Sequence, residues 1–367
     1  MDPNKKVFVD EIRKVHKDLR RKYQKDPDFS KIWEEHCKNE ETLNKYAKSM
    51  QDLATVIWDE DCDGTHRINW CVDTCKKYFL EKEINKYLEK DERRKRHYKK
   101  DPTQFHLGPN PFESFNDEMK DVSERSFCLQ SKLRLLDVGS CYDPFKKYEE
   151  FETTAIDLRP ACETVHKCDF IKVDVSSDIK EEEKFQQTVT TLSAQQAPEI
   201  SILPSSYFHI VVFSLLLTYI PSPQVRWEIC QKAHKVLQTN GLLLIITPDS
   251  SHQNKNAALM KRWKNAIEQI GFQRIKYSKD RHLHFMAFRK VPPDFLWDKR
   301  KISEIYSNKI EKLCLNIPQD FHDCDDGTEN KTDNDITNDF SDVTKDVGAS
   351  TNDITKEISD DRCIQIK

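Results

Sequence analysis

Leu135-Leu136-Asp137-Val138-Gly139-Ser140 is the stretch that decides the fold. An apolar run that ends in an acid and a glycine is typical of the first strand of a Rossmann unit, where the chain turns at the ligand crevice. Gly139 allows the backbone to approach a ligand closely because it has no Cβ. This stretch therefore predicts an α/β domain with a nucleoside site at the end of its first strand.

Further apolar runs follow, separated by segments with helical spacing. This alternation indicates a parallel sheet covered by helices on both faces. The expected strands are Thr154–Leu158, Phe170–Val175, Phe208–Ser214, Leu242–Thr247 and His284–Phe288. The polar segment 176–206 is expected to be a solvent-exposed insertion that carries an irregular helix.

Candidate ligand contacts stand at the ends of these runs. Asp157 lies 18 residues after Gly139, close to the spacing at which a carboxylate accepts hydrogen bonds from ribose hydroxyls. Asp169 and Phe170 pair an acceptor for an exocyclic amine with an aromatic face for a purine. Ser214 ends the fourth strand, where the crevice of a doubly wound sheet opens. Together they predict nucleoside binding.

A dinucleotide is disfavoured as the ligand. The G-x-G-x-x-G motif would require glycines at 141 and 144, where this chain has Cys141 and Pro144. Pyrophosphate would lack its glycine cradle there. A nucleoside that carries an amino-acid chain in place of phosphates fits better.

The predicted organisation has five parts. Residues 1–100 show apolar side chains at helical spacing and form an N-terminal helical subdomain, and 101–131 are a linker. The Rossmann domain covers 132–292, and 293–319 are a C-terminal extension. Residues 320–367 are a disordered acidic tail, with 14 acids against three lysines between Asp320 and Asp361, while residues 1–319 carry a net +5.

Composition also bears on location. The chain shows neither a signal peptide nor an apolar run long enough to span a membrane. Its 12 cysteines are therefore interpreted as reduced thiols, and a cytoplasmic location is expected. The basic clusters at residues 13–25 and 90–100 could contact an acidic partner or RNA, or be solvated helix faces.

A zinc site could use the spacing of Cys62, His66, Cys71 and Cys75. Cys71 and Cys75 lie one helical turn apart, however, and packing in a core is the favoured interpretation, so no metal is assigned.

Three further polar side chains carry open alternatives. Arg67 could donate to a ligand carboxylate or form a surface salt bridge. Asp249 and His252 follow the fifth strand, where they could act as acid and base or, for Asp249, cap a loop.

Several segments resemble one protein family: Leu133–Cys141, Val211–Leu217, Gly241–Asn254 and Phe29–Cys37. They resemble the S-adenosylmethionine sensors upstream of TOR complex 1, and the resemblance runs from about residue 8 to 290. It implies a seven-stranded class I methyltransferase-like fold, with S-adenosylmethionine bound at Gly139, Asp157, Asp169, Phe170 and Ser214. It also implies inhibition of TOR complex 1 through the GATOR and KICSTOR complexes when the ligand is scarce.

An enzyme is the main alternative to a sensor. The same family is similar to a fungal adenine-N1 methyltransferase of large-subunit ribosomal RNA, which would add RNA as the acceptor. The chain lacks an Asn-Pro-Pro-Tyr tetrad after the fourth strand, where it has Ser214-Leu215-Leu216-Leu217. A sensor, by contrast, needs a ligand that favours one conformation of the protein over another. A scaffold with a vestigial pocket is a third hypothesis.

Overall fold

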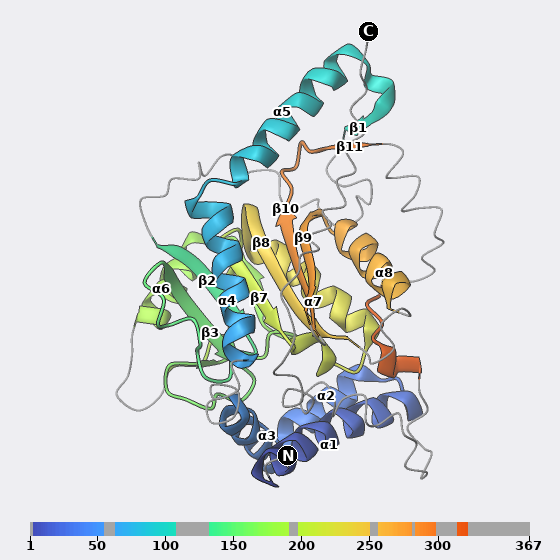
Figure 1. The fold of residues 1–367 in the computed structure, drawn as a ribbon. Helices are drawn as coiled ribbons and strands as arrows, with labels where there is room; N and C mark the ends of the chain where they lie inside the picture. Colours follow the sequence, from blue (N-terminus) through green and yellow to red (C-terminus); the bar gives the residue numbers. More distant parts are fainter. Residues whose placement is uncertain are drawn as a thin grey trace, which may run out of the picture.

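The computed structural model describes residues 3–54, 63–107, 132–190, 197–249, 256–280, 283–298 and 314–321. A seven-stranded sheet crosses the middle of the molecule, with helices on both faces and three N-terminal helices beyond one end (Figure 1). Most of the predicted linker, from 108 to 131, and the predicted acidic tail from 322 onward lie outside the described residues. Among the described helices, none is long and apolar enough to cross a membrane.

The sheet has the order β4-β3-β2-β7-β8-β10-β9. Its strands are β2 (Leu133–Val138), β3 (Phe151–Asp157), β4 (His166–Lys167), β7 (Phe208–Ser214), β8 (Leu237–Pro248), β9 (Phe272–Asp280) and β10 (Leu283–Lys290). The first five strands in this order are parallel, but β10 runs antiparallel to both of its neighbours. The sheet is therefore mixed, and the expectation of a parallel sheet was wrong at this edge.

Two predicted segments differ from the structure. The third parallel strand is β4, not Phe170–Val175, because Asp169 accepts the backbone N–H of Ile171 and turns the chain. Only β5 (Asp174–Ser176) is extended there, and it pairs with β6 (Ile202–Pro204) in a separate two-stranded sheet. The expected exposed insertion contains α6 (Ile179–Thr190) and then buried Ala197, Ile200 and Leu203, so its second part joins the core.

Helices cover both faces of the sheet because its strands are apolar on both. One face packs against α4 (Asp63–Cys75), its π-helical continuation at Lys76–Leu80, and α5 (Ile84–Lys100). The other packs against α6, α7 (Pro223–Val236) and α8 (Ala257–Glu268). Neighbouring residues of one strand point to opposite faces: Leu135 packs in the core beneath α4, and Leu136 packs in the core beneath α7 and α8. The predicted division into domains stays a prediction, although α4 shares its core with the sheet.

Three helices precede this core, in the region where the spacing of apolar residues predicts a helical subdomain: α1 (Pro3–Lys25), α2 (Phe29–Lys38) and α3 (Glu40–Asp52). Asp28 accepts the backbone N–H of Lys31 and caps α2, and Asn39 caps α3 through the N–H of Thr42. The three helices lie beyond the end of the sheet where β3 and β7 finish (Figure 1). They therefore stand over the edge at which the predicted ligand contacts gather.

Two short segments close the fold. β1 (Phe105–Leu107), at the start of the predicted linker, pairs with β11 (Leu296–Asp298) in the predicted extension. Residues 314–321 then return to α7, with Leu315 and Ile317 buried and a short helix at Pro318–Phe321. Asp320 pairs there with the fully buried Arg226, Oδ2 lying 2.6 Å from Nη1. This ion pair fixes Asp320, the first residue of the predicted tail, to the body.

Candidate ligand-binding site

A cavity of about 1520 Å³, solvent at its mouth included, lies between the carboxyl ends of the parallel strands and the N-terminal helices. Its first wall, the sheet-end wall, comes from residues that follow β2, β3, β4 and β7. Its second, the helical wall, comes from α1, α2 and α3 together with Tyr219 and Ile220, which lie further along the chain after β7. Ligands of open α/β sheets bind at this edge of the fold.

Gly139 makes the turn at the bottom of the sheet-end wall. Its φ of +74° lies in the left-handed region, and a Cβ there would stand 3.1 Å from Leu216 Cδ1. Its backbone N–H donates to Ile156 O at 2.9 Å, which ties the turn to β3. The positive φ therefore favours glycine, and a Cβ would fit only with a small shift of the Leu216 side chain.

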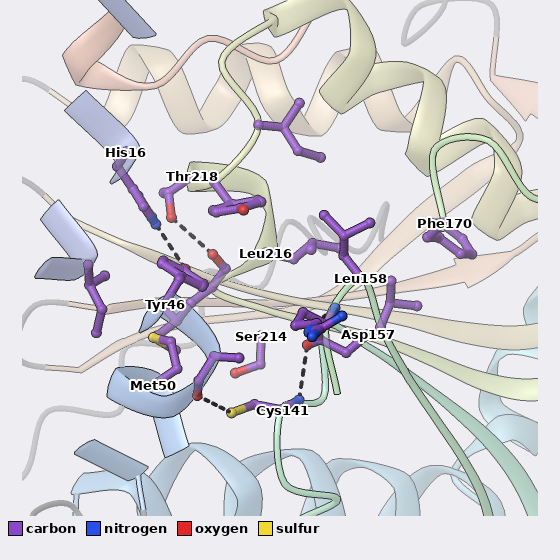
Figure 2. Close-up of a pocket in the computed structure, with 18 of the residues that line it drawn as sticks. His16, Tyr46, Met50, Cys141, Asp157, Leu158, Phe170, Ser214, Leu216 and Thr218 are labelled. Carbon is purple, nitrogen blue, oxygen red and sulfur yellow. Dashed lines mark hydrogen bonds between the residues drawn. The ribbon is translucent and has the colours of Figure 1, made fainter. Parts of the chain in front are cut away.

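Asp157 ends β3 with its carboxylate in the cavity (Figure 2). Oδ2 accepts the backbone N–H of Cys141 at 3.2 Å, and Oδ1 accepts that of Arg159 at 2.9 Å. Burial raises the pKa of Asp157 to about 6, and these two hydrogen bonds oppose the rise. A carboxylate offers about four acceptor positions, so two remain for a ligand.

Asp169 and Phe170 also line the cavity. Asp169 Oδ1 accepts the backbone N–H of Ile171, and Oδ2 accepts the indole N–H of Trp33 at 2.8 Å. Phe170 is buried edge-to-face against Phe213, their ring centroids 5.7 Å apart, and lies toward one side of the cavity (Figure 2). The predicted acceptor is thus already bound by a helix that begins 140 residues earlier in the chain.

Ser214 lines the cavity at the end of β7, and its Oγ accepts a hydrogen bond from Arg67 Nη1 at 3.1 Å. Arg67 is buried on α4 and is not among the lining residues. It is therefore a buried side chain that contacts the cavity wall at Ser214, and not a surface residue. The structure therefore brings five of the six predicted contacts together and leaves Arg67 behind one of them.

The helical wall carries an aromatic cluster that the sequence analysis missed. His16 of α1 hydrogen-bonds to Tyr46 of α3, Nε2 and the hydroxyl lying 3.0 Å apart (Figure 2). Tyr219, after β7, packs edge-to-face on His16 and Trp33 and hydrogen-bonds to His36. In the sequence these side chains appear as ordinary members of apolar helical stripes. A signal was present in α2, where Trp33 and His36 share one helix face.

Side-chain protonation makes this cavity a poor place for nucleophilic chemistry. Burial, with help from Arg20, lowers the pKa of His16 to about 3. Burial also lowers the pKa of His36 to about 4 and raises those of Tyr46 and Cys141. At neutral pH the imidazoles, the phenol and the thiol are all neutral. Among the described lining residues we find no thiolate or activated hydroxyl.

Among the described residues, none of the remaining candidates lines the cavity. Asp249 is buried and pairs with Lys279, with Asn256 and with His284, whose Nε2 is 3.0 Å from Oδ1, so its carboxylate holds the end of the sheet together. His252 and Cys62 are outside the described residues. Cys71 and Cys75 pack in the core beneath α4, and His66 is exposed beside Asp280.

Strand order and cavity together define a class of protein. Numbered along the chain within the main sheet, the strands run 3-2-1-4-5-7-6, with the seventh antiparallel, and the cavity opens where the first, second and fourth end. This is the class I methyltransferase fold, with a helical cover added over its ligand edge.

Comparisons with known proteins give the family. The S-adenosylmethionine sensor upstream of mTORC1 from Danio rerio is 43% identical over 314 residues, which cover 86% of this chain and 76% of that protein. The sensor from Xenopus tropicalis is 44% identical over 312 residues, covering 85% and 74%. This chain belongs to the family of S-adenosylmethionine sensors upstream of mTORC1.

Two further likenesses are more limited. The family model of Bmt2, described as a 25S rRNA (adenine(2142)-N(1))-methyltransferase, matches residues 199–313. Among solved structures, a 1,6-didemethyltoxoflavin-N1-methyltransferase from Burkholderia thailandensis is 13% identical. The match covers 44% of this chain and 72% of that protein's chain, with a TM-score of 0.29.

Proposed function

We propose that this chain binds S-adenosylmethionine in the cavity and reports its concentration to TOR complex 1. The observation that carries the proposal is that one cavity joins nucleoside acceptors at the sheet ends to a separate helical cover. Family membership supports the choice of ligand, since the relatives are named as sensors of S-adenosylmethionine.

Each predicted contact takes one part of the ligand. Gly139 gives the backbone room to approach it, and the free acceptor positions of Asp157 take the ribose hydroxyls. Asp169 and Phe170 flank the adenine. Ser214, held by Arg67, stands at the methionine end, where the guanidinium brings positive charge toward the ligand carboxylate.

Contacts between the two walls explain how occupancy becomes a signal. Trp33 donates to Asp169, Asn44 accepts from the Arg159 side chain, and the Cys141 thiol lies 3.8 Å from Ala47 O. Each joins a helix to the sheet-end wall next to a proposed ligand contact. A ligand seated between the walls would bind the closed arrangement better than an open one, and that difference in affinity is what a sensor requires.

The downstream partners follow from the family resemblance. When S-adenosylmethionine is scarce, the chain would bind the GATOR and KICSTOR complexes in the cytoplasm and inhibit TOR complex 1. Ligand binding would close the helical cover, hide the binding surface and release the inhibition.

A methyltransferase acting on ribosomal RNA adenine is the second candidate. The match of residues 199–313 to the rRNA methyltransferase family model favours it. Adenine N1 attacks a methyl group with its own lone pair, so this reaction needs no base from the cavity, and measurement has to separate the two candidates.

Calorimetry on the full chain tests the ligand that both candidates share, and partner capture with a methyl-transfer assay then separates them. Calorimetry with S-adenosylmethionine and S-adenosylhomocysteine should show saturable binding of both. Capture of GATOR and KICSTOR by the chain should then fall as S-adenosylmethionine is added, with no labelled methyl transferred to ribosomal RNA. Transfer of the label, with partner capture unaffected by ligand, would favour the enzyme instead.

A further inference from the structure

The C-terminal segment 314–321 supplies part of the cavity wall. Gln319 lines the cavity although it lies 180 residues beyond Gly139. Its carboxamide Oε1 is buried and finds no hydrogen-bond partner among the described residues. A buried acceptor without a partner is costly, and a bound group that donates to it offsets that cost.

The segment that carries Gln319 is fixed firmly. Arg226 is fully buried on α7, donates to Leu315 O at 2.9 Å, and contacts Asp320 with both terminal nitrogens, at 2.6 and 3.0 Å. Trp263 donates to Asn316 O at 2.7 Å, and Ile317 is buried in the core. Anchors on both sides of Gln319 hold its backbone in place, so its unpaired oxygen does not result from a loose chain end.

The same arginine joins this segment to the helical wall. Arg226 Nε donates to Ile220 O at 2.7 Å, and Ile220 lines the cavity next to Tyr219. Gln319 thus stands on the wall that Tyr219 and the N-terminal helices form. Asp169, the acceptor predicted from the sequence, already accepts from Trp33 and from two backbone N–H groups, whereas Gln319 has an oxygen to offer.

We propose that Gln319 is a ligand-specificity residue, whose carboxamide oxygen accepts a hydrogen bond from an N–H donor of the nucleoside bound in this cavity. This inference rests on the proposed binding of S-adenosylmethionine. That ligand has two N–H donors, the exocyclic amine of adenine and the ammonium of the methionine chain. Glutamine side chains elsewhere read adenine through its amine and a neighbouring ring nitrogen.

The test uses calorimetry on the full chain with three variants. Gln319→Met keeps the side-chain length but has no strong acceptor, and Gln319→Glu keeps an acceptor oxygen. Gln186→Ala, on the exposed face of α6, is the control for loss of a glutamine far from the cavity. Gln319→Met should bind S-adenosylmethionine about tenfold more weakly, while the other two stay within about threefold of wild type.

Two analogues then identify the donor. S-inosylhomocysteine lacks the amine, and 5′-methylthioadenosine lacks the ammonium. For the analogue that lacks the donor bound by Gln319, wild type and Gln319→Met should have equal affinities. Equal affinities with either analogue support the proposal. Wild-type affinity of Gln319→Met for S-adenosylmethionine would overturn it.

Thermal unfolding without ligand guards against a purely structural role. Because Gln319 has an unpaired oxygen in the free protein, the melting temperature of Gln319→Met should equal or exceed that of wild type. A lower melting temperature, with equal losses of affinity in the Met and Glu variants, would also overturn the proposal. Failure of the wild-type chain to bind S-adenosylmethionine would instead reject the proposed function.

Discussion

The two walls of the cavity are built in different ways. Backbone hydrogen bonds fix the sheet-end wall: the N–H of Gly139 binds Ile156 O, and those of Cys141 and Arg159 bind Asp157. The helical wall meets it largely through side chains, such as Trp33 with Asp169 and Asn44 with Arg159. The sheet-end wall is therefore suited to hold a ligand in a fixed place, and the helical wall to move when the ligand leaves.

The largest expected effect on ligand binding comes from a change in the sheet-end wall. Gly139→Arg should abolish S-adenosylmethionine binding in calorimetry, because a long side chain at this turn would fill the space of the ligand. The positive φ should also cost about 1 to 2 kcal/mol of unfolding free energy. Gly139→Ala should lose less affinity, since its Cβ meets only the movable end of Leu216. Normal binding by the arginine variant would exclude this turn from the site.

Asp157→Ala should weaken S-adenosylmethionine binding by about 1.5 to 3 kcal/mol, the scale of hydrogen bonds to a charged acceptor, without unfolding the chain. Asp178→Ala is the matched control, because Asp178 also accepts a backbone N–H, that of Lys180, but stands at α6 away from the cavity. Equal affinities of the two variants in calorimetry would remove Asp157 from the ligand contacts.

The pH dependence of binding gives a second check on Asp157. Its pKa in the free protein is raised to about 6, and ribose hydroxyls bind the charged carboxylate better. Affinity should therefore fall as the pH drops through about 6, and Asp157→Asn should lack this fall. Stability should respond in the opposite sense: a raised pKa favours folding at low pH, and this contribution is lost as the pH rises through about 6.

Trp33→Phe tests the helical wall, and its expected effect on ligand binding is smaller. It removes the indole N–H that binds Asp169 but keeps an aromatic ring, so we expect about 1 kcal/mol weaker ligand binding by calorimetry. Trp227→Phe is the control, because it removes a similar indole hydrogen bond, to Ala266 O, inside the sheet domain. That control should lower the melting temperature and leave affinity unchanged. Weaker ligand binding by Trp227→Phe but not by Trp33→Phe would show that the Trp33–Asp169 hydrogen bond does not couple the helices to the ligand.

Deleting residues 322–367 should have the smallest effect. The deletion keeps Gln319 and the Asp320–Arg226 ion pair, which fix the last described segment to α7. Melting temperature and affinity, by thermal unfolding and calorimetry, should stay almost unchanged. A drop of several degrees would show that the acidic segment docks on the body.

The sheet-end wall could be predicted from sequence because its determinants are local. An apolar strand followed by Gly139, and an acid 18 residues later at Asp157, lie within one strand–turn–strand unit. The same locality predicts β7 with its observed bounds. β9 was missed because only Phe272 is fully buried in it, so its sequence shows no apolar run.

The helical wall could not be predicted in the same way, because its contacts join residues far apart in the chain. Trp33 and Asp169 are 136 positions apart, and His36 and Tyr219 are 183 apart. Helical spacing identifies which side chains are buried but not what they are buried against. Gln319 was missed for the same reason, since it reaches the cavity only because Arg226 holds the C-terminal segment.

Hydrogen exchange of the full chain, with and without S-adenosylmethionine, tests whether the ligand closes the helical wall. If the ligand closes the helical wall onto the sheet ends, amides of α1, α2 and α3 and of the region around Arg67 to Trp70 should exchange more slowly when it is bound. GATOR and KICSTOR binding should fall over the same ligand range. Protection confined to residues 133–250, with partner binding indifferent to the ligand, would contradict the account.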